Sequence, residues 1–204
     1  MAWAPSALFN ATTNTYDLFW ATRLYSETDE EHTGTASLDR IRHATTKDFI
    51  TFSEPEDYLA LDEENIPLID QEFLSIGQGK EDEEEEKYAR FLKDENVLHV
   101  YQEVTSGGLF GEWTRSPTVN GSGYIATRTF EGPAAFPDIN VQGRYYLLMD
   151  NYEEYVPFVT EDIVGGVWEE LEIGETGMPR GLKHGSVVLV TEEEYDALVE
   201  SYGL

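Results

Sequence analysis

The chain of 204 residues contains no cysteine, which excludes disulfide bonds, cysteine-ligated zinc and thiol nucleophiles. No apolar run approaches the ~18 residues of a membrane-spanning helix, and the first residues do not read as a signal peptide. Phosphate-binding loops, Gly-x-Ser-x-Gly elbows and His-x-x-x-His pairs are absent as well. The usual signatures of nucleotide, serine-hydrolase and zinc-protease sites are therefore missing.

Basic residues are scarce, with 13 Lys and Arg against 41 Asp and Glu and a net charge of −28. Such a surface repels phosphate backbones and anionic headgroups, so neither nucleic acid nor a membrane is an expected partner. The acidic run Glu81–Glu86 could bind calcium ions. We interpret it as a solvated hairpin loop, because it lacks the spaced ligands and the glycine of a calcium loop.

A weak internal repeat organises the chain. Three short apolar stretches occur at 3–9, 69–74 and 130–136, and each leads into a tyrosine-led strand at 16–20, 88–92 or 145–149. A period near sixty residues with several short strands per unit indicates the blades of a β-propeller in a single all-β domain, 1–204. An irregular β-sandwich remains the alternative.

The C-terminal part adds two expected elements. The apolar run 185–190 predicts a buried strand, and Thr191 with Glu194 forms a capping box that starts a short helix.

Equivalent positions of successive blades converge at one end of the central channel, and here these positions hold Ser6, Asp70 and Glu131. Two neighbouring carboxylates are the groups that glycoside hydrolysis needs. Glu131 is the stronger candidate for the acid, because Gly132 and Pro133 follow it and Phe130 could form an apolar wall beside it. Asp70 would be the second carboxylate.

Two other side chains are candidates for the channel. His184 could be a metal or water ligand, or a hydrogen-bonded structural residue. Trp3 could stack on a sugar ring or pack in the core.

The chain resembles glycoside hydrolase family 43, whose members are five-bladed propellers that cleave arabinofuranosides and β-xylosides with inversion. The resemblance rests on an ordered series of stretches: Trp3-Ala-Pro5, 47–52, Ile69-Asp70, Glu131-Gly-Pro133, 145–151, and Lys183-His-Gly185 leading into 191–195. It implies an incomplete propeller with about four blades and a short C-terminal helix, lacking the N-terminal blade.

The resemblance also implies roles for individual residues. Glu131 would be the general acid, and Asp70 would keep that acid protonated and orient it. Trp3, Phe130 and His184 would contact the carbohydrate substrate. No cofactor is required, although His184 would hold a calcium ion or water in the channel. An extracellular location follows from the expected polysaccharide substrates.

The sequence departs from the family pattern at two points. Ser6 stands where members usually have Glu, and the family's general base lies on a blade upstream of Trp3. Three hypotheses therefore compete: a glycosidase, a carbohydrate-binding propeller without turnover, and an acidic scaffold. An open blade edge also predicts self-association.

Overall fold

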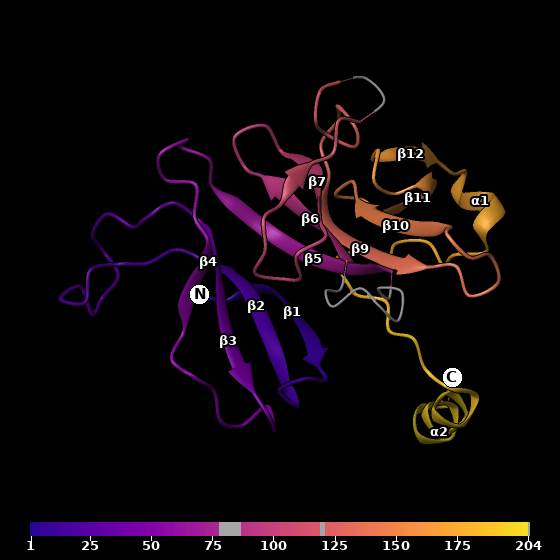
Figure 1. The fold of residues 1–204 in the computed structure, drawn as a ribbon, viewed down its shortest axis with the longest axis horizontal. Coiled ribbons are helices and arrows are strands. Elements are labelled where there is room, and N and C mark those ends of the chain that lie inside the picture. The colour runs from indigo at the N-terminus through magenta and orange to yellow at the C-terminus, as the bar shows by residue number, and fades with distance from the viewer. Residues whose placement is uncertain (78–86, 119–120, 204) are drawn as a thin grey trace.

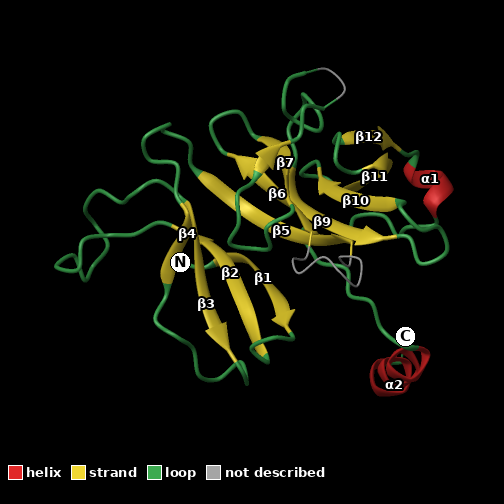
Figure 2. Ribbon diagram, viewed as in Figure 1, coloured by secondary structure: helices red, strands yellow, loops and turns green. Residues whose placement is uncertain are grey.

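The computed structural model describes residues 1–77, 87–118 and 121–203. It contains three four-stranded antiparallel sheets and two helices (Figures 1 and 2). The predicted all-β class is therefore confirmed. The acidic run Glu81–Glu86 lies outside the described residues. No helix in the described part of the chain is long and apolar enough to cross a membrane.

Each sheet follows the order of its strands in the sequence. The first sheet consists of β1 Trp3–Asn10, β2 Thr15–Thr22, β3 Arg40–Thr46 and β4 Glu56–Leu59. The second consists of β5 Leu68–Gly77, β6 Lys87–Asp94, β7 His99–Thr105 and β8 Thr114–Arg115. The third consists of β9 Glu131–Pro137, β10 Tyr145–Asp150, β11 Tyr155–Asp162 and β12 Val167–Glu170. The repeat predicted the first two strands of every sheet.

The second sheet lies between the other two (Figure 1). One hydrophobic cluster joins it to the first sheet, with Phe19 packed against Phe73 at a ring distance of 4.7 Å. The other joins it to the third sheet, with Phe91 packed against Trp168 at 5.8 Å. Strand β6 is consequently buried on both faces, and its charged side chains must find partners inside the protein.

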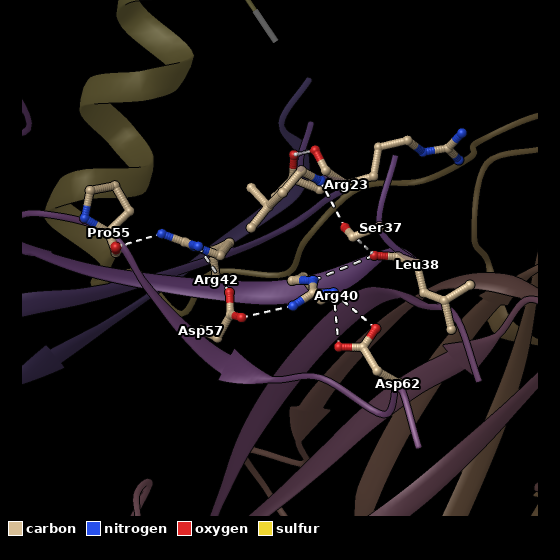
Figure 3. Close-up of polar contacts among 10 residues, drawn as sticks. Arg23, Ser37, Leu38, Arg40, Arg42, Pro55, Asp57 and Asp62 are labelled. Carbon is tan, nitrogen blue, oxygen red and sulfur yellow. Dashed lines mark hydrogen bonds and ion pairs between the residues drawn. The ribbon is translucent and has the colours of Figure 1, made fainter. Parts of the chain in front are cut away.

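Paired charges also fix the outer strands of the first sheet. Arg40 binds Asp57 on β4 at 2.8 Å and Asp62 at 2.9 Å, and Arg42 binds the other oxygen of Asp57 at 2.9 Å (Figure 3). Asp57 thus has a fixed orientation at the edge of this sheet.

The predicted terminal strand is wrong. Residues 185–190 adopt no strand, and Val188, Leu189 and Val190 are 76%, 59% and 46% exposed. An apolar run forms a strand only beside another strand that takes its backbone hydrogen bonds, and no described strand lies beside this one. The described residues therefore form three sheets rather than about four blades, and they do not close into a ring (Figure 1).

Two short helices complete the fold. Helix α1, Ile173–Thr176, follows the third sheet, and α2, Glu192–Tyr202, ends the chain. The capping box of Thr191 and Glu194 is present as predicted. Helix α2 buries none of its residues and projects away from the sheets (Figure 1).

Candidate functional site

The first strand of every sheet contains the same irregularity. The pairing register shifts between Trp3 and Ser6 on β1 and between Ile69 and Glu72 on β5. On β9 the partners of Ala134 and Glu131 are Leu148 and Asp150, so one extra residue is inserted there too. Such β-bulges bend a strand and change the direction in which its side chains point.

A left-handed residue begins each bulge. The φ angles are 44° at Ala4, 55° at Asp70 and 52° at Gly132. Non-glycine residues rarely adopt such angles, and this strain is concentrated at functional sites. The structural equivalent of Asp70 is therefore Ala4 on β1 and Gly132 on β9. This corrects the sequence alignment, which matched Asp70 with Ser6 and Glu131.

The bulges nevertheless bring the predicted residues together. Asp70 is 3% exposed, and its Oδ2 accepts a 3.0 Å hydrogen bond from the backbone N–H of Gly132. His184 bridges the two carboxylates, with Nε2 3.5 Å from Asp70 and Nδ1 3.9 Å from Glu131. A Cβ atom on Gly132 would lie 2.9 Å from the His184 ring, so this close approach needs glycine.

His184 is held in a strongly acidic environment. The hydrogen bond with Asp70 raises the pKa of His184, burial works against this effect, and the charges of Asp70, Glu131 and Asp150 add to it. The imidazolium form is thus favoured between the carboxylates.

We expect Asp70→Asn to lower the pKa of His184 toward its ordinary value, because the largest cause of the upward shift is removed. An NMR titration of the His184 ring protons measures the change. Asp138→Asn, just past the far end of β9, is the matched control and should leave the His184 titration unchanged. An unchanged titration in Asp70→Asn would contradict the described geometry.

Lys93 is a central residue of the site that the sequence did not single out. Its buried ammonium contacts Glu131 Oε2 at 2.9 Å, Glu95 at 2.6 Å and the Tyr152 hydroxyl at 2.8 Å. Burial works to lower the pKa of Lys93, but these three acceptors outweigh it and the pKa is raised. One feature of the sequence could have indicated Lys93. It is the charged residue directly after the tyrosine-led segment 88–92, and Asp150 follows the equivalent segment 145–149 in the same way.

The site opens into a cavity of about 690 Å³. Its lining includes Trp3, Asp70, Lys93, Glu131 and His184. This volume is within the range of small-ligand pockets. Trp3 is 45% exposed and belongs to the lining of this cavity, and its contact with substrate stays a prediction.

Phe130 does not meet its prediction. It is 1% exposed and packs in the core against Phe158 at a ring distance of 5.6 Å. Because it directly precedes the first residue of β9, its side chain turns into the space between the second and third sheets, while Glu131 faces the cavity. Phe130 therefore belongs to the core and cannot contact substrate.

A smaller cavity of about 110 Å³ adjoins His184. Gln71 and Glu72 line it, and the buried amide of Gln71 has no hydrogen-bond partner in the described part of the chain. Burial raises the pKa of Glu72 to about 8, so this carboxyl is mostly protonated at neutral pH.

The residues match a calcium ion poorly. Glu131, Asp150 and His184 offer ligand atoms within 4.8 Å of one another. Calcium prefers six to eight oxygen ligands, whereas this set contains one imidazole and two carboxylates, one of which binds Lys93. The channel calcium ion stays a prediction, and the chemistry proposed below does not depend on it.

Comparison with curated proteins finds an α-L-arabinofuranosidase of Bifidobacterium longum subsp. longum. It is 27% identical over 188 residues, which cover 78% of this chain and 16% of that protein. The chain therefore spans less than a fifth of that relative's length.

Two solved structures have a similar fold. A glycosyl hydrolase from Bacteroides ovatus gives a TM-score of 0.54 at 12% identity, over 88% of this chain and 51% of the other. A β-1,3-galactosidase of glycoside hydrolase family 43 gives 0.50 at 14% identity, over 83% of this chain and 32% of the other. At such low identity these two matches establish the fold alone.

One family model covers nearly the whole chain, residues 1–196, and its description is "Probable glycosyl hydrolase domain". The match includes Asp70, Glu131 and His184, which line the 690 Å³ cavity. The chain belongs to this glycosyl hydrolase family, which is related to glycoside hydrolase family 43.

Proposed function

We propose that this chain supplies the general acid of an inverting glycosidase site. The site would act on arabinose- or xylose-containing glycans outside the cell. The observation that carries the proposal is the buried Asp70, which lies with His184 beside Glu131 at the wall of the 690 Å³ cavity. The pentose preference rests on the arabinofuranosidase relative and on the sequence resemblance.

Glu131 would protonate the leaving glycosidic oxygen. Lys93 holds Oε2 and would stabilise the carboxylate that forms when Glu131 gives up its proton, and that proton would be carried by Oε1, the oxygen that faces His184. Asp70 would orient His184 and, through its bond from the Gly132 amide, fix the bulge that aims Glu131. In this scheme Asp70, His184 and Lys93 are positioning residues, and Glu131 is the catalytic residue.

An inverting reaction also needs a base that activates water on the opposite face of the sugar. The carboxylates that line the cavity are Asp70, Glu95 and Glu131. Glu95 shares the ammonium of Lys93 with Glu131, so both lie on the same side. Among the described residues, the cavity lining therefore supplies no carboxylate suited to this role, and the reaction would be slow unless another group provides the base.

The test is turnover of nitrophenyl α-L-arabinofuranoside and nitrophenyl β-D-xyloside by the chain, with and without azide as a substitute for the base. We expect slow turnover that azide accelerates. NMR of the first-formed product should show the α-configuration, in free xylose or in the xylosyl azide that forms when azide attacks in place of water, as inversion of a β-xyloside requires. A first-formed β-anomer would overturn the inverting mechanism, and no turnover of either substrate with azide would overturn the acid role.

A non-catalytic carbohydrate-binding domain is the second candidate. It is favoured by the absence of an opposing base in the described cavity lining and by Ala4 and Ser6 on β1, where the second sheet places Asp70 and Glu72. It predicts binding of xylose or arabinose oligomers without turnover, and azide-dependent hydrolysis would rule it out. The scaffold hypothesis does not predict the carboxylate-lined cavity.

A further inference from the structure

We propose that the cleft between the first and second sheets is a second glycan-binding site, which takes a neutral sugar chain without cleaving it. We call it the Phe110 cleft. Its volume is about 320 Å³, and its principal lining residues are His43, Glu56, Tyr58, Arg90, Phe110 and Trp113. It shares no lining residue with the 690 Å³ cavity, so binding in it can be separated from turnover.

Aromatic rings form the walls of the Phe110 cleft. Phe110 is 60% exposed, and its ring is 5.0 Å from His43 and 5.7 Å from Tyr58 in edge-to-face geometry. Trp113 is half-buried beside them. Aromatic rings offer a large contact area at a low entropy cost and stack on the apolar faces of sugars.

The loop that carries Phe110 is held in place. The Tyr58 hydroxyl and the Trp113 indole N–H both donate to the backbone oxygen of Leu109, at 2.5 and 3.3 Å. The Leu109 side chain is buried in the hydrophobic cluster between the sheets. Phe110 is thus an exposed apolar ring on an anchored loop, and such preorganisation reduces the entropy cost of binding.

The charged side chains around the cleft are already neutralised in pairs. Arg90 is 5% exposed and lies 4.3 Å from the Trp113 ring, and its Nε donates to Glu103 at 2.7 Å. His43 contacts Asp17 at 2.8 Å.

At the rim, Asp57 is bound by two arginines (Figure 3). Glu56 lies beside it, with a side chain that is 72% exposed. Because the buried charges have counterions, the cleft favours a polar ligand without net charge.

These features together indicate a neutral oligosaccharide. The rings would stack on one sugar face, and the exposed Glu56 carboxylate would accept bonds from hydroxyl groups. A volume near 320 Å³ is at the lower end for small-molecule sites and suits one or two sugar residues. The choice of pentose oligomers as ligands rests on the proposed function. A cation attracted to the acidic rim is the competing outcome of the test.

The experiment is an NMR titration of the labelled chain with xylotriose and with arabinotriose, up to about 10 mM. We expect shifts at the Trp113 indole and at His43. Phe110→Ala should weaken this binding at least about tenfold and leave turnover of nitrophenyl glycosides unchanged. Phe49→Ala replaces a phenylalanine that is similarly exposed, at 51%, and as the matched control should change neither.

Three results would overturn the proposal: no shift at Trp113 with either trisaccharide, equal binding by Phe110→Ala, or shifts there with tetramethylammonium but not with sugar. The wild-type titration uses no substituted protein, so its result does not depend on the stability of a variant. Binding at Trp113 without any turnover would support the cleft while removing the catalytic function.

Discussion

Replacing Glu131 by Gln is expected to lower kcat/KM for nitrophenyl α-L-arabinofuranoside by about 10²- to 10⁴-fold, the usual contribution of general acid–base catalysis. Gln preserves the shape of the side chain and its contact with Lys93 through the amide oxygen, but it cannot donate the acidic proton. The measurement is steady-state kinetics of the azide-supplemented reaction.

The leaving group provides the internal control. A dinitrophenyl glycoside needs little protonation as its bond breaks, so Glu131→Gln should lose less than about tenfold with it. Glu200→Gln, at an exposed carboxylate on helix α2, should retain full activity with both substrates. Equal losses with both leaving groups would show that Glu131 contributes to the site by some means other than proton donation.

Replacing Lys93 by Met is expected to lower the free energy of unfolding by about 3 kcal/mol, the lower end of the cost of breaking a buried ion pair. The Lys93 side chain is 3% exposed, and its loss leaves Glu95 and Glu131 without their shared cation. Urea unfolding measures the change as a shift of the midpoint at constant m. Lys47→Met, at an exposed lysine, is the control and should change stability by less than about 0.5 kcal/mol.

A double-mutant cycle identifies the source of this loss. If Lys93 acts mainly by neutralising Glu131, then Lys93→Met should cost at least about 1 kcal/mol less in the Glu131→Gln background. Strictly additive effects would contradict the pairing with Glu131, and would leave Glu95 and Tyr152 as the partners through which Lys93 stabilises the fold.

The sequence by itself determined the repeat and the class of fold. The repeated apolar stretches and the tyrosine-led segments after them located the first two strands of each sheet, and the capping box of Thr191 and Glu194 located the last helix. The acidic residues Asp70 and Glu131 could be selected because they lie where consecutive repeats begin. These inferences depend on patterns in the sequence and need no contact between distant segments.

The tertiary structure decided which side chains meet. A one-residue bulge matches Asp70 with Gly132, and its register depends on pairing with a neighbouring strand and on the bond from the Gly132 amide. Lys93 becomes part of the site only because β6 and β9 lie in adjacent sheets.

The same reason explains the failed predictions. Phe130 and the run 185–190 are both apolar, and a sequence cannot show which apolar segment has a partner to pack against. Phe130 lies between two sheets and is buried, whereas none of the described strands lies beside Val188, which stays exposed. Apolar character is a property of the residue, but burial depends on contacts between segments distant in the chain, and only the folded arrangement of the sheets supplies those.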